Sequence, residues 1–373
     1  MIIEANMLKP NELPVNKIIC GDAFEVLKKL PSNSIDAVVT DPPYGWEFMG
    51  QEWDKDVPPV RLWQEVLRVM KPGAHLLCFF GTRTYHRGVM NIERAGFEIR
   101  DMIVWLYGSG FPKGQALDKL IDKELGAYDK RKLIGVKEWI QEGGSAYNLR
   151  MGDKRIVKQL ISEPATPEAK KWVGWNTQLK PACEPIVLAR KPISEKNLAR
   201  NVLKWGVGGL NIDACRIGNE LIKTQAKTAK DSPLSNFGKT GFKGCGESYH
   251  YGRYPANVIL DEEAAKMLDE QSGYSKSRPD WRNNEPVENY IYGSGWKRKS
   301  PLLNDEGGAS RFFYCAKAGR NERFAYCCDC DKVIPQKEWS KHKDHKIIYH
   351  TTVKPLKLME YLVRLITPPN GIV

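Results

Sequence analysis

The feature that most constrains the fold is a short apolar run that ends in four residues of a very different kind. The run, Ile35-Asp36-Ala37-Val38-Val39-Thr40, has the length and composition of a buried strand. Asp41-Pro42-Pro43-Tyr44 follows it directly, so these four residues fall on the loop that leaves the strand's C-terminal end. Open α/β sheets bind their ligands at that edge. The sequence therefore predicts an α/β sheet with a binding loop at Asp41.

The composition is that of a globular chain with a positive charge balance. The 373 residues are 42% hydrophobic and 27% charged, which suits two or three domains. Lysine and arginine exceed aspartate and glutamate by 57 to 45, and this net charge of +12 is compatible with a polyanionic partner. No run approaches the ~18 apolar residues of a membrane span, and the N-terminus has no signal-peptide pattern. We therefore expect a cytoplasmic protein without a membrane contact.

Strand and helix patterns alternate through residues 1–115. We expect strands at 17–20, 35–40, 75–80 and 102–107, and helices at 23–30, 60–70, 85–95 and 355–366. Such an alternation predicts a parallel sheet with helices on its faces. Cys20 and Cys78 lie inside apolar runs, so we expect both to be buried thiols.

From about Gly108 to about Ser310 the pattern is mixed. Basic pairs lie near aromatic residues in this region: Lys154-Arg155, Lys170-Lys171, Arg190-Lys191 and Lys297-Arg298-Lys299, with Trp172, Trp175, Tyr292 and Trp296. A single basic pair is usually a solvated face, which is the simpler interpretation of each one. Taken together, the pairs favour an insert that contacts nucleic acid, because bases stack on aromatic rings.

Several segments resemble one enzyme family. Asp41-Pro42-Pro43-Tyr44 matches the catalytic motif of amino-group DNA methyltransferases, which make N6-methyladenine or N4-methylcytosine, and His350-Thr351-Thr352-Val353-Lys354-Pro355 resembles the segment before their cofactor loop. Residues 105–113, 179–185 and 253–257 look like segments of phage and prophage DNA methylases. The resemblance covers nearly the whole chain. Its motif order is similar to that of the β class, in which a target-recognition domain separates the two motifs.

The resemblance implies an α/β fold with a Rossmann-like, permuted methyltransferase sheet. It divides the chain into a catalytic subdomain (1–115), a recognition insert (116–310), a Cys/His-rich segment (311–350) and a return to the methyltransferase domain (351–373). The family's Gly-rich turn for the methionine part of the cofactor has no counterpart in the sequence. We therefore expect an incomplete sheet, a truncated C-terminus and weak cofactor binding by the chain as given.

The resemblance also implies roles for individual residues. The catalytic residues would be Asp41, Pro42, Pro43 and Tyr44: the Asp41 carboxylate and the Pro42 carbonyl accept the N–H bonds of the base, and Tyr44 stacks on the flipped base. The residues expected near S-adenosylmethionine are Gly21, Asp22, Asp41, Thr352, Lys354 and Pro355. Two alternatives stay open, since Asp22 would also suit an N-cap and Lys354 a surface lysine.

The cysteines and histidines of residues 327–345 predict a zinc site. Cys327-x2-Cys330 and His342-x2-His345 are separated by eleven residues, close to the usual ~12. His350 offers a wider histidine spacing, and Cys328 is an alternative to Cys327. Four protein ligands leave no open position, so the metal would be structural or would support DNA contact. A reduced knuckle without metal is the alternative.

Four readings of the function differ in what they predict. Aspartate at the first motif position favours adenine N6 in this family, cytosine N4 is the close alternative, and the third is a DNA-binding remnant without activity. The fourth is methylation of RNA or of protein amides, against which Asp41 argues, because related enzymes of that kind usually carry asparagine at this position. Double-stranded DNA is the expected partner in the first three. A restriction endonuclease is a candidate partner protein, while the oligomeric state stays open.

Overall fold

A computed structural model describes residues 2–4, 6, 8–47, 52–108, 110, 114–142, 154–224, 248–276, 306–316, 324–327, 330, 332–335, 341–342, 347–348 and 354–373. The chain forms two compact units. The first comprises Met1–Leu106, Glu184–Gly319 and Lys354–Val373, and the second comprises Tyr107–Cys183 and Arg320–Val353. None of the helices in these described residues has the length and apolar character to span a membrane.

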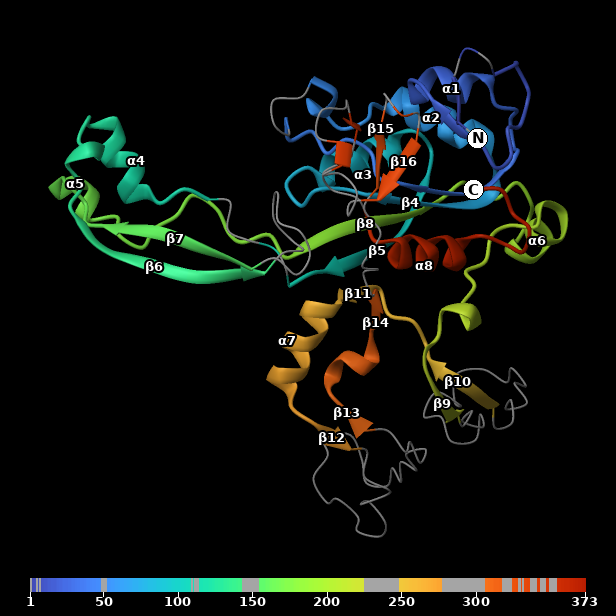
Figure 1. Cartoon of the computed structure of the whole chain (residues 1–373). Coiled ribbons are helices and arrows are strands. Elements are labelled where there is room, and N and C mark those ends of the chain that lie inside the picture. Colours follow the sequence, from blue (N-terminus) through green and yellow to red (C-terminus); the bar gives the residue numbers. More distant parts are fainter. Residues whose placement is uncertain are drawn as a thin grey trace, which may run out of the picture. The chain divides into compact units, whose positions relative to one another are not determined.

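The first unit holds a six-stranded sheet and most of the helices (Figure 1). Its main elements are β1 (Ile2–Glu4), β2 (Ile18–Cys20), α1 (Ala23–Lys29), β3 (Ile35–Thr40), α2 (Val60–Val69), β4 (Met70–Phe79), α3 (Tyr85–Arg94), β5 (Glu98–Leu106), β8 (Cys183–Arg190), α6 (Leu198–Trp205), β9 (Ile217–Thr224), β10 (Ser248–Arg253), β11 (Val258–Asp261), α7 (Glu262–Ser272), β12 (Ser275–Lys276), β13 (Glu306–Gly307), β14 (Tyr314–Ala316) and α8 (Leu356–Ile366). The predicted α/β class is confirmed, and β3 has the predicted bounds.

The sheet is mixed, so the expected parallel arrangement holds for β3 and β4 of residues 1–115 but not for the sheet as a whole. The strand order is β14-β11-β5-β8-β4-β3, in which β3 is parallel to β4 while β8 is antiparallel to β4. Arg190 at the end of β8 binds Glu98 at the start of β5 at 2.6 Å, so β8 also runs back along β5. The reversal follows from the chain path, because a chain that leaves the sheet at Leu106 and returns at Cys183 re-enters beside the strand it left.

The sheet also takes three strands from outside residues 1–115. Strands β8 and β11 lie in the predicted insert (116–310), and β14 lies in the predicted Cys/His-rich segment (311–350). The periodicity of residues 1–115 cannot indicate them, because the choice of strand neighbours is made by long-range pairing. The division into units accordingly differs from the predicted domain limits, which remain predictions.

Each face of the sheet has its own core, because successive residues of a strand point to opposite sides. In β4, Leu77 and Phe79 pack on one face, and Leu76 and Cys78 pack on the other. Helix α8 covers the first face through Leu358, Tyr361, Leu362, Leu365 and Ile366, and helices α2 and α3 cover the second through Trp63, Val66 and Ile92 (Figure 1). This packing fixes the start of α8 beside the ends of the central strands.

His75 is a buried polar residue of β4. Its side chain is 5% exposed, and its Nδ1 has no hydrogen-bond partner among the described residues. Burial, together with the nearby charges of Arg190 and Arg100, lowers the pKa of His75 to about 4. The imidazole is therefore neutral in the folded protein near neutral pH.

The N-terminal strands lie outside the central sheet. β1 and β2 form a parallel pair of their own, so Gly21 and Asp22 follow a strand that is not part of the six. The prediction for the two thiols is half right, because Cys78 is buried whereas Cys20 is exposed. At the other end of the chain, Ile372 is hydrogen-bonded to Asp36 of β3. The Ile372 N–H donates to Asp36 Oδ2 at 2.9 Å, and the Asp36 N–H donates to the Ile372 carbonyl at 2.9 Å.

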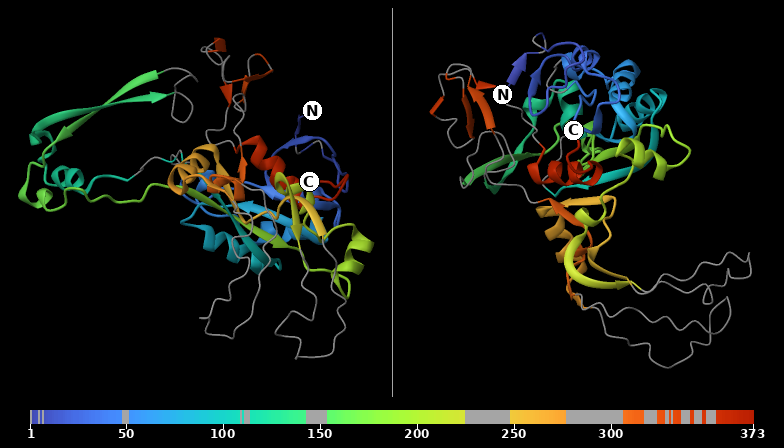
Figure 2. Two further views of the ribbon diagram at one scale, coloured as in Figure 1. Left: turned by 90° about the horizontal axis from the view of Figure 1, so that it is seen from below. Right: turned by 90° about the vertical axis from the view of Figure 1, so that its right-hand side faces the viewer.

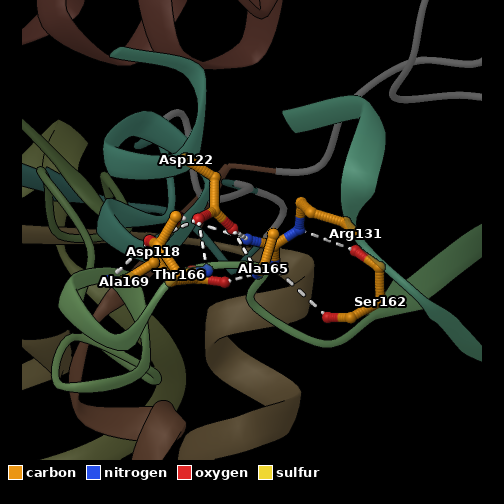
Figure 3. A network of polar contacts seen from close by, with 7 residues as sticks. All are labelled: Asp118, Asp122, Arg131, Ser162, Ala165, Thr166 and Ala169. Atoms are coloured by element: carbon orange, nitrogen blue, oxygen red, sulfur yellow. Dashed lines mark hydrogen bonds and ion pairs between the residues drawn. The ribbon is translucent and has the colours of Figure 1, made fainter. Parts of the chain in front are cut away.

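The second unit is built around a two-stranded ribbon. Its elements are α4 (Leu117–Glu124), β6 (Leu133–Glu142), β7 (Lys154–Ser162), α5 (Pro167–Lys170), β15 (Phe324–Cys327), β16 (Lys332–Pro335) and β17 (Ile347–Ile348). Strands β6 and β7 are antiparallel and run side by side (Figure 2). At the base of the ribbon, Arg131 is 3% exposed and forms ion pairs with Asp118 and Asp122 (Figure 3).

Hydrogen bonds saturate the buried carboxylate of that network. Asp122 accepts bonds from the Ala165 N–H at 2.9 Å and from the Thr166 N–H and hydroxyl at 3.1 and 2.7 Å (Figure 3). Desolvation raises the pKa of Asp122, but these bonds and the Arg131 guanidinium outweigh it, so its pKa lies below the ordinary value. The network joins α4, the end of β7 and the start of α5 into one fold.

Candidate active site

Three strand ends meet at one edge of the sheet in the first unit. Thr40 pairs with Cys78, which pairs with Val187, so the last residues of β3 and β4 lie beside the first residues of β8. Asp41 leaves the sheet at this edge, and Glu184 enters it there. The antiparallel course of β8 is the reason that a residue from its N-terminal end reaches the C-terminal ends of β3 and β4.

Four polar side chains form a cluster at this edge, which we call the Asp41 cluster: Asp41, Tyr44, Glu184 and Lys354. The Tyr44 hydroxyl lies 2.8 Å from Asp41 Oδ1 and 2.9 Å from Glu184 Oε2. The Lys354 ammonium donates to Asp41 Oδ2 at 2.8 Å and forms an ion pair with Glu184 Oε2 at 3.1 Å. The two carboxylates are therefore bridged twice, once by a hydroxyl and once by an ammonium group.

The four side chains differ in exposure. Lys354 is 9% exposed, and its ammonium lies 5.0 Å from the centre of the Phe79 ring and 5.5 Å from that of Tyr44. Asp41 and Glu184 are 26% and 22% exposed. Lysine is thus buried beneath two carboxylates that remain open to solvent, which leaves their outer lone pairs accessible to a ligand.

Tyr44 remains a neutral hydroxyl in this environment. Its burial raises its pKa above the ordinary range, and the charges of Glu184 and Asp41 raise the pKa further. A hydroxyl carries one proton, so it donates to one carboxylate at a time.

A second aspartate holds the backbone of the loop. Asp54 is 3% exposed, and its Oδ1 accepts the N–H bonds of Tyr44 and Gly45 at 2.7 and 2.9 Å. The Thr84 hydroxyl donates to the Tyr44 carbonyl at 2.5 Å. Gly45 has a φ of +68°, and a Cβ there would lie 2.9 Å from the Val57 nitrogen, so only glycine suits the turn.

An indole ring lies beside the loop. Trp46 meets the Tyr44 ring edge-on at 5.7 Å, and the Arg83 guanidinium lies 4.6 Å from the centre of its ring. A Cβ on Gly81 would come within 2.2 Å of the ring, so glycine is required for this packing. The Trp46 Nε1 is buried and has no partner within the described part of the chain. This indole N–H is a donor that a ligand at the strand edge could satisfy.

The structure brings some of the predicted site residues together and leaves others apart. Asp41, Tyr44 and Lys354 are in direct contact, and Pro42 and Pro43 are partly buried between Asp41 and Tyr44. Pro355 separates Lys354 from the first residue of α8. Asp22 accepts the Glu25 N–H at 3.1 Å as the N-cap of α1, with Gly21 before it. Thr352 lies outside the described residues.

The predicted zinc ligands are described only in part. The Cys330 Sγ lies 3.6 Å from the His342 Nδ1, so one cysteine and one histidine of the predicted set are neighbours. His345 and the side chain of Cys327 are outside the described residues, as are the alternatives Cys328 and His350. Among the residues that are described, no group of three or more His, Cys, Asp or Glu side chains could hold a metal ion. The zinc site stays a prediction.

Sequence reasoning missed two residues that define this edge, Glu184 and Asp54. Glu184 belongs to the segment 179–185 that resembles phage methylases, but nothing in that segment indicates contact with a residue 143 positions earlier. Asp54 follows a loop in a polar stretch, where an aspartate is unremarkable. The Glu184 contact depends on which strands become neighbours, whereas the Asp54 contact depends on how the loop after β3 turns back on itself.

Comparison with known proteins gives one family. A sequence model of the DNA methylase family matches residues 35–373. The type II methyltransferase M.HindIII of Haemophilus influenzae is 24% identical over 290 residues, which are 66% of this chain and 78% of that protein. M.HpaI of Haemophilus parainfluenzae is 30% identical over 105 residues, and the chain spans only 33% of its length.

Solved structures give weaker likenesses. The PvuII cytosine-N4-specific DNA methyltransferase is 13% identical with a TM-score of 0.26, over 68% of this chain and 77% of that one. The M1.HpyAVI–SAM complex is 14% identical with a TM-score of 0.24, over 52% of this chain and 58% of that one. The family match covers the Asp41 cluster, the second unit and helix α8 alike. The chain therefore belongs to the DNA methylase family of N6 and N4 amino-methyltransferases.

Proposed function

We propose that this chain transfers a methyl group from S-adenosylmethionine to the exocyclic amine of a base in double-stranded DNA, with adenine N6 as the preferred acceptor. One observation carries the proposal. The Asp41 carboxylate stands at the C-terminal edge of the central strands, is partly open to solvent and is oriented by Tyr44 and Lys354. A carboxylate acceptor at this place is what an amine substrate requires.

The chemistry of the acceptor explains the residue types. The lone pair of an exocyclic amine is delocalised into the base, so the nitrogen is a poor nucleophile. An ionised Asp41 would accept one amine N–H bond and the Pro42 carbonyl would accept the other, which localises the lone pair. The rate then depends on alignment and on fixed charges in a site that excludes water. The base must leave the duplex stack to reach the site, and Tyr44 is the proposed stacking partner.

The donor set fits the cofactor of the family. When bound, S-adenosylmethionine supplies an electrophilic methyl group on a positively charged sulfonium. The two carboxylates of the Asp41 cluster against one ammonium give an excess of negative charge that suits a cation. The Trp46 indole N–H, which has no partner in the described part of the chain, offers a further donor. Lys354 and Pro355 are the proposed cofactor-side residues at the start of α8, with Gly21, Asp22 and Thr352 proposed by sequence resemblance.

A radioactive transfer assay followed by nucleoside analysis tests the proposal. The purified chain is incubated with labelled S-adenosylmethionine and mixed-sequence duplex DNA, and the DNA is then digested to nucleosides. We expect the label in N6-methyl-2′-deoxyadenosine. Label in N4-methyl-2′-deoxycytidine would reverse the choice of base while leaving the reaction type intact. DNA binding without transfer, at saturating cofactor, would instead support the DNA-binding remnant.

A further inference from the structure

The Asp41 cluster contains a carboxylate that the four-residue motif does not supply. Glu184 is the second residue of β8. It shares both partners of Asp41, the Tyr44 hydroxyl at 2.9 Å and the Lys354 ammonium at 3.1 Å. A buried lysine needs a counter-charge, and Asp41 alone could provide it. The presence of a second carboxylate therefore calls for an explanation beyond the burial of Lys354.

Formal charges give that explanation. Asp41 and Glu184 contribute two negative charges, Lys354 contributes one positive charge, and the protonated Tyr44 contributes none, so the cluster carries a net charge of about −1 at neutral pH. Without Glu184, the Lys354 ammonium would neutralise Asp41 completely. With Glu184 present, one ammonium is shared by two carboxylates, so the site keeps an unbalanced negative charge at its solvent-facing edge.

We propose that Glu184 is a positioning residue for methyl transfer. By sharing the Lys354 ammonium with Asp41, it prevents that ammonium from neutralising Asp41 completely, so the site stays anionic beside the acceptor amine. This inference rests on the proposed function and extends it to a residue outside the motif. It makes the role of Glu184 electrostatic and indirect, since Glu184 acts through Lys354 and Tyr44 on the carboxylate that would touch the base.

The reaction gives a reason for an anionic site. The amine nitrogen donates its lone pair to the methyl carbon while the carbon–sulfur bond breaks and its electron pair stays on sulfur. The positive charge thereby moves from sulfur to nitrogen, and the new aminium group then loses one proton, for which Asp41 is the proposed first acceptor. A fixed negative charge next to the nitrogen stabilises the charge that develops there in the transition state.

Two replacements at Glu184 separate the effect of its charge from the effect of its shape. Glu184→Gln keeps the shape and loses the charge, whereas Glu184→Asp keeps the charge and shortens the side chain. We expect Glu184→Gln to lower kcat about 30-fold, as one unit charge about 8 Å from the reacting nitrogen would at an effective dielectric constant of about 20. Glu184→Asp should retain more activity than Glu184→Gln. The reverse order would overturn the proposal, because it would mean that the shape of the side chain matters more than its charge.

A second-site change gives the sharper test. Lys354→Gln in the Glu184→Gln background restores the net charge of the cluster to about −1, so kcat should recover at least about 5-fold relative to Glu184→Gln alone. If Glu184 only holds its neighbours in place by hydrogen bonds, the double variant is slower than either single variant, and the proposal is overturned. kcat is measured with DNA and cofactor both saturating, so changes in KM do not enter.

Urea unfolding of the protein without substrate separates a failure of the proposed function from a failure of the role proposed for Glu184. Lys354→Gln should lower the urea midpoint of unfolding in the wild-type background and lower it much less in the Glu184→Gln background, because the repulsion between two carboxylates is then absent. If the changes in urea midpoint of the two single variants simply add in the double variant, Glu184 and Lys354 do not interact, and this holds whether or not the protein is active. A wild-type chain with coupled midpoints and no methyl transfer would overturn the proposed function, and the role of Glu184 with it, while leaving the cluster standing. An active wild type with coupled midpoints but no kcat recovery would overturn the role of Glu184 alone.

Discussion

Two clusters in this chain have the same formal make-up and opposite surroundings. Each contains two carboxylates and one cation together with hydroxyl groups: Asp41, Glu184, Lys354 and Tyr44 in the first unit, and Asp118, Asp122, Arg131, Ser162 and Thr166 in the second. The difference lies in how the excess negative charge is satisfied. In the second unit backbone N–H groups take it up, and Asp122 is fully buried. In the first unit Asp41 is 26% exposed, and its partners among the described residues are two side chains.

The comparison teaches that charge composition alone does not tell a structural network from a reactive one. A buried carboxylate whose lone pairs all accept hydrogen bonds has nothing to offer a ligand, and it serves to join elements of the fold. A carboxylate held by two side chains and open on its outer edge can still accept a bond from a substrate. The predictions below test this distinction, from the largest expected effect to the smallest.

Asp41→Asn should nearly abolish methyl transfer without unfolding the protein. We expect kcat to fall at least about 1000-fold, or about 4 kcal/mol, because the charge that accepts the amine N–H is lost. The free energy of unfolding should change by less than about 1 kcal/mol, since the side chain is partly exposed. Asp213→Asn is a matched control, because Asp213 is 86% exposed and lies in the same unit. Equal kcat values for the two variants would remove Asp41 from the active site.

Arg131→Met should do the reverse and destabilise the second unit. Removing one partner of a buried ion pair typically costs about 3–5 kcal/mol, because the remaining carboxylates keep their charge without a counter-ion. Lys158→Met is the matched control, since Lys158 pairs with Glu138 on the exposed face of the ribbon and its loss should cost less than about 1 kcal/mol. Hydrogen exchange of the β6 and β7 amides measures both. Equal protection in the two variants would mean that the buried network does not hold the unit together.

Acid should act on the two units in different pH windows. The folded-state pKa of His75 is about 4 against an ordinary value of 6.5, so the unfolded chain binds more protons in between and stability falls as the pH drops through this range. The full loss would be at most about 3 kcal/mol. The pKa of Asp122 is lowered, so its contribution is present above its ordinary value of 3.8 and is lost only below it.

Exchange-derived opening free energies for each unit between pH 4 and 6.5 check the His75 window. The first unit should lose stability there while the second keeps it, and His75→Gln should flatten the dependence in the first unit. A slope that persists unchanged in His75→Gln would show that another group is responsible.

Tyr44→Phe should give the smallest of these effects on the reaction. The ring remains and only the hydroxyl that bridges Asp41 and Glu184 is lost, so we expect kcat to fall about 10-fold, the value of one hydrogen bond to a charged group. Tyr251→Phe, at a tyrosine that is 70% exposed in the same unit, controls for loss of a hydroxyl elsewhere. A loss as large as that of Asp41→Asn would mean that Tyr44 does more than orient the carboxylate.

Much of the local structure could be predicted from the sequence. The run 35–40 became β3 with the predicted bounds, and the helices expected at 60–70, 85–95 and 355–366 are present within a residue or so at each end. These segments are decided by periodicity, which acts within a few residues. The N-cap role of Asp22 was foreseeable for the same reason, because a cap bonds only to the next turn of chain. The expected break at Pro72-Gly73 does not separate two elements, since both residues lie inside β4, which begins at Met70 rather than at residue 75.

The sequence by itself determined where the binding loop would lie, because a buried strand followed by Asp41 places a carboxylate at a sheet edge. It also placed Lys354 before a helix, without its partner. Tertiary structure decided that β8 would run antiparallel between β4 and β5, and this reversal alone brings Glu184 to Asp41 and Lys354. Strand pairing is a choice among distant segments with similar local propensity, and packing on both faces of the sheet makes that choice. The four-residue motif therefore predicted Asp41 and Tyr44, and the fold brought Glu184 and Lys354 to them.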